Sequence, residues 1–413
     1  MSHSSKNALR IAYFVDTFPC RTENFILREI AGALTFWPEI RVYSFREAPE
    51  NWKYVDCAEV AQRVRHRSIR LSLLDLTLAY ASWISGHPIR FVRCFLRSLQ
   101  IHGAMVHCAL RRMNEAVALA QIARSDGVEH FHAHFLAETA IVCCLAAGLT
   151  GISFSVSVHA NDIWGRKPPL RVLDNAVCCV ACTMQAKRFI ERARPGINVE
   201  CIRHGLPKTG FLLDPVPESP AMPPVRLISA GRFVAKKGFE VLIRACALLS
   251  KEGLDYQCEI VGEGPLEESL RCLVSDLSLN DRVRILPFCS FPELAREIEQ
   301  AHLFIMASQT DTETGDRDGM PNVILEAMKC GTIVIASKTP TIEEVLVDRK
   351  NSFLFEMGDP SALTRTIQIA LASQTDWPKV RREALRVLSE EFSDRRNIQS
   401  LCSAIERTRA REC

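Results

Sequence analysis

Short apolar runs alternate with amphipathic segments along most of the chain. In the first half, the helical spacing of Ile26, Ile30 and Leu34 predicts a helix over 23–37. A strand precedes this helix and another follows it, an order that is typical of a parallel sheet with helices on its faces. The apolar runs of this half predict strands over 10–15, 40–45, 128–134, 153–159, 177–181 and 199–203.

The second half of the chain starts the same alternation again. Ser290 and Glu293 have the spacing of a capping box, which predicts the start of a helix between two apolar runs. We therefore expect a second parallel sheet. Its predicted strands are 225–231, 256–262, 283–288, 303–308 and 333–336.

A proline-rich segment separates the two halves. Residues 215–224 contain five prolines and little apolar pattern, as an interdomain linker does. A chain of 413 residues also fits two hydrophobic cores better than one. We expect an α/β protein with a first domain over 1–206, a linker over 207–224 and a second domain over 225–390. The last helix, 391–413, is expected to cross back to the first domain.

The stretch from Asp318 to Gly331 predicts a loop that enters a helix at Pro321. Proline suits the first turn of a helix, and Gly331 suits its left-handed end. The free N–H groups at the start of such a helix bind anions. Asp318 and Glu326 frame this helix start and suit hydroxyl groups better than an anion. Phosphates between hydroxyl-bearing rings describe a nucleotide sugar. The alternative is a capped helix with one buried glutamate.

Two cations follow the first predicted strand of the second domain. Arg232 offers a two-pronged donor and Lys237 a compact charge, the pair expected around a diphosphate. Loop cations are often merely solvated, and that alternative stays open for these two residues.

Both motifs resemble those of the family-4 retaining glycosyltransferases. Asp318-Gly319-Met320-Pro321 followed by Glu326 matches the donor signature of that family, and Gly231, Arg232, Lys237 and Gly238 match its diphosphate clamp. The resemblance implies the GT-B fold, with two doubly wound, Rossmann-like parallel sheets facing across a cleft. It is nearest to the branch that builds bacterial exopolysaccharide and lipopolysaccharide, the colanic-acid-type enzymes. One departure is Asp318, where the family more often has glutamate.

The resemblance also implies roles for single residues. Asp318 would hold sugar hydroxyls and Glu326 the ribose hydroxyls, while His159 would contact the reacting sugar. The implied catalytic residues are His159, Arg232, Lys237 and Asp318. A backbone-bonded, structural His159 is the alternative. The implied donor contacts are Gly231, Arg232, Lys237, Gly262, Gly264, Phe288, Asp318, Gly319, Met320, Pro321, Asn322, Val323 and Glu326.

The acceptor is expected to meet the first domain. Phe18-Pro19 and Glu23-Asn24-Phe25 resemble a Phe-Pro and Glu-x-Phe loop of the same branch, and we expect acceptor contacts at Phe18 and Glu23. A further acceptor contact is expected at Asn161, where the predicted strand 153–159 has just ended. Glu23 has alternative roles: it caps or neutralises the start of the helix that follows it, or it meets the donor sugar.

No metal or other cofactor is expected. His130, His132 and His134 share one face of a strand, but no carboxylate follows at a telling spacing. The spacing of Asp316 and Asp318 matches a metal pair, yet Asp318 belongs to the donor motif. The 17 cysteines are scattered through strand and helix patterns, which favours reduced thiols in the cytoplasm. We see no signal peptide and no membrane span in the sequence.

Residues 60–112 form a basic, amphipathic region that we expect to be helical. They contain nine arginines and one acidic residue, a net charge of +8. Such a surface suits anionic lipid headgroups, with shallow insertion of Phe91, Phe95 and Leu96. We therefore expect a cytoplasmic protein on the inner face of the membrane. A solvated helix face, or arginines that bind a phosphate of the acceptor, are alternatives. Nucleic acid is not expected, since no nucleic-acid module accompanies the charge.

The resemblance implies a hexosyltransferase that takes a sugar from a UDP- or GDP-linked donor to a glycan or lipid-linked acceptor with retention of configuration. Its expected setting is bacterial cell-surface polysaccharide synthesis. Two alternatives remain: a sugar-nucleotide epimerase on the same fold, and a non-catalytic, membrane-associated sugar-nucleotide-binding protein. The donor sugar, the acceptor and the oligomeric state are not predicted.

Overall fold

The computed structural model describes residues 9–20, 23–48, 60, 64–164, 167–206 and 223–409. The chain divides into two compact units. Unit 1 holds residues 1–205 together with 394–413, and unit 2 holds residues 206–393. Most of the predicted linker lies outside the described residues.

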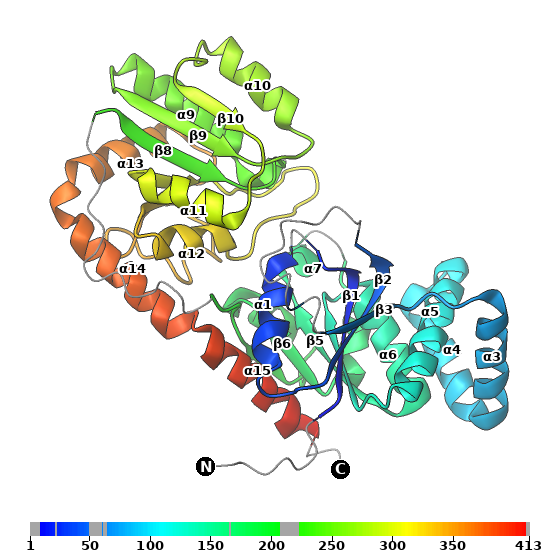
Figure 1. The fold of residues 1–413 in the computed structure, drawn as a ribbon. Helices are drawn as coiled ribbons and strands as arrows, with labels where there is room; N and C mark the ends of the chain where they lie inside the picture. Colours follow the sequence, from blue (N-terminus) through cyan, green and yellow to red (C-terminus); the bar gives the residue numbers. More distant parts are fainter. Residues whose placement is uncertain are drawn as a thin grey trace, which may run out of the picture. The chain divides into compact units, whose positions relative to one another are not determined.

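Unit 1 is built on a seven-stranded parallel sheet with the order β3-β2-β1-β4-β5-β6-β7 (Figure 1). The order reverses between β1 and β4, which places a topological switch point at the carboxyl ends of these two strands. The strands are β1 (Ile11–Phe18), β2 (Ile40–Glu47), β3 (Arg65–Ser68), β4 (His130–His134), β5 (Ser153–Val158), β6 (Cys178–Ala181) and β7 (Val199–Cys201).

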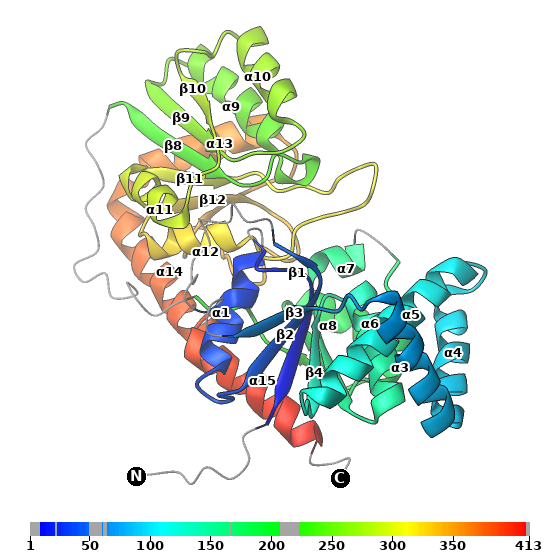
Figure 2. The same ribbon diagram turned by 45° about the vertical axis from the view of Figure 1, so that its right-hand side comes forward.

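Helices cover both faces of this sheet because its strands are apolar on both sides. On β1, Phe14 joins the core beneath α5 and α6, while Tyr13 joins the core beneath α1 and α15. Helices α3 and α4 pack against α5, and Figure 2 shows them at the outer edge of the unit. The helices are α1 (Asn24–Ala33), α3 (Leu73–Gly86), α4 (Pro88–His102), α5 (Val106–Ser125), α6 (Glu138–Thr150), α7 (Ala160–Trp164), α8 (Met184–Ala193) and α15 (Asp394–Arg409), with a 3-10 turn η2 (Leu170–Asn175).

The last helix, α15, belongs to unit 1 although unit 2 precedes it in the chain. It packs along α1, where the missing side chain of Gly32 leaves room for Ile398. Trp37, fully buried, donates a 2.9 Å hydrogen bond from its indole Nε1 to Glu406. Unit 1 is therefore completed by a segment that lies far from it in the sequence.

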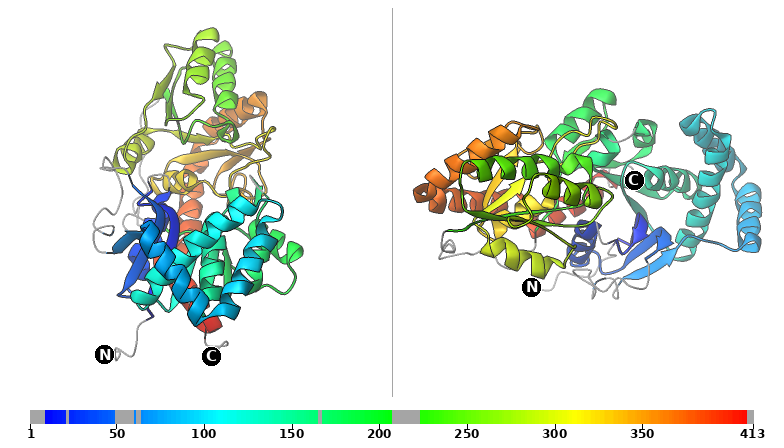
Figure 3. Two further views of the ribbon diagram at one scale, coloured as in Figure 1. Left: turned by 90° about the vertical axis from the view of Figure 1, so that its right-hand side faces the viewer. Right: turned by 90° about the horizontal axis from the view of Figure 1, so that it is seen from above.

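Unit 2 is a six-stranded parallel sheet with the order β10-β9-β8-β11-β12-β13. Its switch point lies between β8 and β11. Helices α9, α10 and α13 share a core with one face, and α11, α12 and α14 share a core with the other (Figure 3). The strands are β8 (Val225–Ala230), β9 (Tyr256–Val261), β10 (Val283–Leu286), β11 (Leu303–Met306), β12 (Ile333–Ser337) and β13 (Phe353–Phe355). The helices are α9 (Phe239–Lys251), α10 (Glu267–Asp276), α11 (Phe291–Gln300), α12 (Asn322–Lys329), α13 (Pro360–Ala372) and α14 (Trp377–Glu391), with 3-10 turns η3 (Ala235–Lys237) and η4 (Gln374–Asp376).

The basic region differs from the prediction in two ways. It is not helical throughout, because residues 65–68 form the edge strand β3 against β2. Phe91 and Phe95 do not face outward, because both pack against the core of unit 1, whereas Leu96 is exposed. Arg63 lies outside the described residues. Among the described helices, none is both long and apolar enough to cross a membrane.

Candidate functional site

The donor motifs predicted in unit 2 come together at its switch point. Lys237 follows β8 and Asp318 follows β11, and these strands are neighbours in the sheet. The Lys237 ammonium lies 2.8 Å from Asp318 Oδ2. Lys236 lies 2.8 Å from Asp316 and 3.7 Å from the second oxygen of Asp318. The predicted clamp and the predicted sugar ligand are therefore direct partners.

The Asp318 carboxylate is held in its charged form. Burial raises the pKa of this carboxyl, but the charges of Lys237 and Lys236 and hydrogen bonds from Lys237 and Ser308 more than offset it, so the pKa lies below its usual value. The Ser308 hydroxyl donates to Asp318 Oδ2 over 3.0 Å. The hydroxyl of Thr341 binds the backbone carbonyl of Asp318. Side chain and backbone of Asp318 are both fixed, which leaves a rigid acceptor for hydroxyl groups.

Glycines let the backbone loops of this site lie against one another. Gly238 has a left-handed φ of 64°, and a Cβ there would lie 1.9 Å from the carbonyl oxygen of Ala307. A Cβ on Gly262 would lie 2.0 Å from the carbonyl oxygen of Gly231, and one on Gly264 would meet the backbone of Phe233. The predicted donor residues Gly231, Gly262 and Gly264 thus pack as one layer at the ends of β8 and β9.

Helix α12 begins one residue later than predicted. Pro321 is its N-cap, with extended ψ of 122°, and Asn322 is the first helical residue. Gly331 follows the helix with a left-handed φ of 75°, as predicted. The free N–H groups of the first turn therefore begin at Asn322 and Val323. Glu326 lies one turn further along and is half-buried.

The other predicted donor residues lie around this cluster. Arg232 is exposed at the end of β8, and Phe288 is exposed after β10. Gly319 and Met320 form a bend before α12. Arg232 makes no ion pair with any described residue, so its guanidinium differs from the paired ammonium of Lys237.

Unit 1 carries a second polar cluster, which begins with the three histidines of β4. All three are fully buried. Hydroxyls of the neighbouring strand β5 satisfy two of them: His130 binds Ser153 and Ser155, and His132 binds Ser155 and Ser157, over 2.8–3.0 Å. These hydrogen bonds between β4 and β5 give His130 and His132 a structural role.

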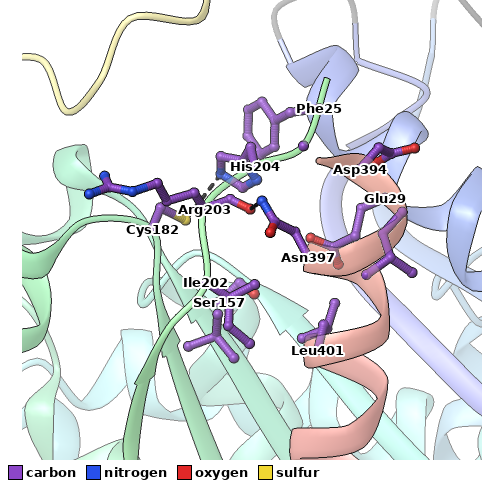
Figure 4. A pocket seen from close by; sticks show the side chains of 13 residues that line it. Phe25, Glu29, Ser157, Cys182, Ile202, Arg203, His204, Asp394, Asn397 and Leu401 are labelled. Atoms are coloured by element: carbon purple, nitrogen blue, oxygen red, sulfur yellow. Dashed lines mark hydrogen bonds between the residues drawn. The ribbon is translucent and has the colours of Figure 1, made fainter. Parts of the chain in front are cut away.

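The third histidine starts a chain of ring contacts. His134 Nε2 lies 3.2 Å from the Glu29 carboxylate, and its Nδ1 lies 3.3 Å from His159 Nε2. His159 Nδ1 lies 3.3 Å from His204 Nε2, and the Cys182 thiol lies 3.0 Å from the same His204 nitrogen. Figure 4 shows Cys182 and His204 in a small cavity that Glu29 also lines. Glu29 on α1 brings a carboxylate to the histidines that no spacing in the sequence indicated.

These contacts change the role that can be given to His159. Both of its ring nitrogens face other side chains, and only 8% of the residue is exposed. Burial, followed by the charges of His204 and His134, holds the pKa of His159 well below its usual value. Burial likewise lowers the pKa of His204 to about 4. The pair is therefore uncharged at neutral pH.

The predicted acceptor residues have three different environments. Phe18 ends β1 with 2% of its surface exposed and packs beside His66, so its ring belongs to the core. Asn161 is exposed on α7. Glu23 holds the N-cap position of α1, but its side chain forms no capping hydrogen bond. The capping alternative for Glu23 was therefore wrong.

Glu23 has an unusual carboxyl group. Its Oε2 is buried and has no hydrogen-bond partner among the residues that the structure describes. Burial raises the pKa of this carboxyl to about 7; His134 lowers it, and Asp16 and Asp162 add to the rise. A carboxyl that titrates near neutral pH is typical of functional sites.

Several residues of these clusters were not predicted. Lys236 and Ser308 in unit 2 and Glu29, Cys182 and His204 in unit 1 became visible only in the fold. For Cys182 and His204 a signal existed, since both follow predicted strands whose carboxyl ends share one edge of the sheet. Glu29 lies inside a helix, and nothing in its neighbourhood in the sequence pointed to His134.

Comparisons with known proteins agree with the donor motifs. Residues 198–386 match the family described as Glycosyl transferases group 1. The amylovoran biosynthesis glycosyltransferase AmsK of Erwinia amylovora is 30% identical over 184 residues, which are 45% of each chain. The chain therefore spans about half the length of that relative. The putative colanic acid biosynthesis glycosyltransferase WcaL of Salmonella typhimurium is 22% identical over 96% of this chain and 100% of its own.

A solved structure resembles the whole chain. Anabaena Alr3699/HepE in complex with UDP matches with a TM-score of 0.70, at 16% identity over 96% of this chain and 100% of its own. At that identity the likeness concerns the fold alone. The predicted fold, GT-B with two parallel-sheet domains, is confirmed.

Proposed function

Residues 198–386 match the family Glycosyl transferases group 1, and we propose that the chain is a family-4 retaining glycosyltransferase. It moves a hexose from a UDP- or GDP-linked donor to a glycan or lipid-linked acceptor. Relatives named for amylovoran and colanic acid biosynthesis support a place in bacterial cell-surface polysaccharide synthesis. The observation that carries the proposal is the Lys237–Asp318 pair at the switch point of unit 2.

The pair gives unit 2 the two kinds of contact that a nucleotide sugar needs. Lys237, Arg232 and the first-turn N–H groups of α12 supply positive potential for the diphosphate. Asp318, kept ionised by two lysines, accepts hydrogen bonds from sugar hydroxyls, and Glu326 does the same for the ribose. Because Asp318 sets the position of Lys237, the sugar contact and the phosphate contact are fixed together.

The leaving diphosphate is stabilised by fixed cations in this proposal. Negative charge grows on the diphosphate as the glycosidic bond breaks, and preorganised donors lower the energy of that state without first reorganising. The reaction therefore needs no divalent cation at the diphosphate.

Unit 1 is proposed to bind the acceptor and an anionic membrane surface, on the cytoplasmic side. Helices α3 and α4 expose an apolar face beside Arg90 and Arg93, where Ile89, Val92 and Leu96 recur at helical spacing. Further exposed apolar residues on α3 are Leu73, Leu74 and Leu78. Apolar side chains next to exposed arginines fit the boundary between headgroups and acyl chains of an anionic membrane.

Transfer from a labelled donor to a membrane extract tests the proposed function. We expect one UDP- or GDP-linked hexose to label an extractable glycan or lipid, with release of the nucleoside diphosphate that depends on the extract. An epimerised donor formed without any extract would show an isomerase instead, and no conversion of any donor would contradict the proposal.

A further inference from the structure

Three potential metal ligands converge at the carboxyl edge of the sheet of unit 1. His159 directly follows β5 and Cys182 directly follows β6, and the last residues of these strands, Val158 and Ala181, are register partners. His204 comes three residues after β7, the next strand of the same sheet. Nδ1 of His159, Sγ of Cys182 and Nε2 of His204 all lie within 4.8 Å of one another.

We propose that His159, Cys182 and His204 form a binding site for a transition-metal ion, with Zn²⁺ as the fitting ion. Thiolate and imidazole are the ligands that zinc prefers. Zinc–ligand bonds of about 2.0–2.3 Å in tetrahedral geometry put two nitrogens about 3.3 Å apart and a nitrogen and a sulfur about 3.6 Å apart. The corresponding distances here are 3.3 Å between the two nitrogens and 3.0 and 3.7 Å from the sulfur to each of them. Three protein ligands leave a fourth position for water or another ligand.

The surroundings of His159 have the form of a metal site's outer shell. A ligating histidine usually donates its other ring N–H to a carboxylate, a backbone carbonyl or water, which fixes the ring orientation. Here His159 Nε2 faces His134 Nδ1, and His134 Nε2 faces the Glu29 carboxylate. One set of neutral tautomers satisfies this whole chain, with N–H donated from His159 to His134 and from His134 to Glu29, and leaves His159 Nδ1 free to bind an ion.

The site is also enclosed. The ring of Phe25 lies 4.3 Å from that of His204 and 5.0 Å from that of His159, measured between centroids. The neighbouring cavity, in which Figure 4 shows Phe25 and His204, measures about 20 Å³, which is room for one water molecule or ion.

A second group of potential ligands, Glu29 with His132 and His134, fits less well. Both ring nitrogens of His132 already bind serine hydroxyls, and His134 is engaged on both sides. An ion there would have to displace contacts that the fold provides. We therefore assign Glu29 and His134 to the outer shell of the first site.

The inference goes beyond the proposed function and does not depend on it. It differs from a divalent cation at the donor diphosphate, since Mg²⁺ and Mn²⁺ prefer oxygen ligands to thiolate and imidazole. The site is built from unit 1 alone, so metal binding can be measured on the full chain without any nucleotide sugar.

Cobalt titration of the chelator-stripped full chain tests the site. We expect one Co²⁺ per chain, with a thiolate-to-cobalt charge-transfer band and the visible bands of tetrahedral Co²⁺, all lost when Zn²⁺ is added. Cys182→Ser abolishes the charge-transfer band. Glu29→Gln keeps the band and weakens binding about 10- to 100-fold, as outer-shell changes do. Zn²⁺ at a hundredfold excess over its Kd raises the Tm of wild type by roughly 5 °C or more.

Two further variants separate this site from adventitious binding and from misfolding. Cys108→Ser removes a different Cys–His pair, formed with His107 on α5, and should leave the band and the stoichiometry unchanged. His204→Gln keeps the thiol and should still lose tetrahedral binding, which covers the case in which Cys182→Ser fails to fold. Failure of the folded wild type to bind Co²⁺, or equal binding by Cys182→Ser and His204→Gln, would overturn the proposal and leave the cluster as a hydrogen-bond network only.

Discussion

Lys237 and Asp318 show how single residues gain their role from the fold. The motif spacing predicted a donor contact for each of them, but it assigned them to separate parts of that donor. The ion pair between them follows from the adjacency of β8 and β11, which no local pattern reveals. The contact between Glu29 and His134 in unit 1 likewise joins residues that lie far apart in the chain. Residue types and motif spacing predict chemistry, whereas partners distant in the chain require the topology.

Loss of the Lys237 ammonium should slow transfer strongly. Lys237→Ala is expected to lower turnover by about 10²–10³-fold, the scale for one charge-stabilising donor at a developing anion. Steady-state transfer rates measure this effect. Arg244→Ala is the matched control, because Arg244 is an exposed cation of the same unit whose one ion pair among the described residues is with Glu240 on its own helix. Equal rates for folded Lys237→Ala and wild type would remove Lys237 from the site.

Glu23 should make stability depend on pH. Its pKa is 4.5 when unperturbed and about 7 in the folded chain, so between these values the folded state holds a proton that the unfolded chain has released. The contribution of Glu23 to the free energy of unfolding is therefore complete below about pH 4.5 and is lost as the pH rises through 7.

Thermal unfolding of wild type and Glu23→Gln between pH 5 and 8 measures this contribution. The glutamine side chain stays neutral, so the Tm of the variant relative to wild type should increase as the pH rises. Parallel Tm profiles for the two proteins would show that the Glu23 carboxyl is already ionised at pH 5.

At the scale of elements, the apolar pattern predicted nearly all strands and their order of appearance. The capping box at Ser290 and Glu293 correctly marked the start of α11. Edge strand β3 was missed because its sequence, Arg-His-Arg-Ser, has no apolar alternation. Backbone pairing with β2 holds it, and charged edge strands of this kind also resist pairing with other chains.

The α3–α4 surface should be the part of unit 1 that meets membranes. Arg90 and Arg93 are exposed on α4, and each surface cation adds roughly 1 kcal/mol of attraction to an anionic leaflet. Reversing both charges should remove at least about 2 kcal/mol, roughly 30-fold in partitioning. Flotation with anionic vesicles, without acceptor, measures the effect for Arg90→Glu/Arg93→Glu. Arg97 is left intact because it is half-buried and donates a hydrogen bond to the carbonyl of Arg171. Arg90 donates to the carbonyl of Thr150 but is exposed.

A matched double variant controls for net charge. Arg244 and Arg271 are exposed cations of unit 2, so Arg244→Glu/Arg271→Glu changes the total charge equally and should float as wild type does. High salt should release wild type, since a surface attraction is screened within about 8 Å at physiological ionic strength. Equal recovery of wild type with neutral and anionic vesicles would leave α3 and α4 as a solvated surface.

At the scale of the whole molecule, length and composition predicted two α/β domains, and the fold has two parallel-sheet units. Their boundary, at residue 206, lies next to the predicted linker. The sequence does not predict the contacts between α15 and the rest of unit 1, since the packing of Ile398 against Gly32 depends on how the two helices lie together. In both units, the proposed binding residues lie at the carboxyl ends of the parallel strands, where the sequence has its most polar motifs.

We propose that fixed cations of unit 2 hold the diphosphate of a sugar nucleotide without a divalent cation. Calorimetric titration of UDP and GDP into the full chain, in the presence of EDTA, tests it directly. We predict that one of the two nucleotides binds to wild type with one-to-one stoichiometry. Lys237→Ala should weaken this binding about 10- to 100-fold, which is the range for a hydrogen bond to a charged group. Arg244→Ala should leave the affinity unchanged. Binding of neither nucleotide until Mg²⁺ or Mn²⁺ is supplied, or equal affinity in wild type and Lys237→Ala, would contradict the claim.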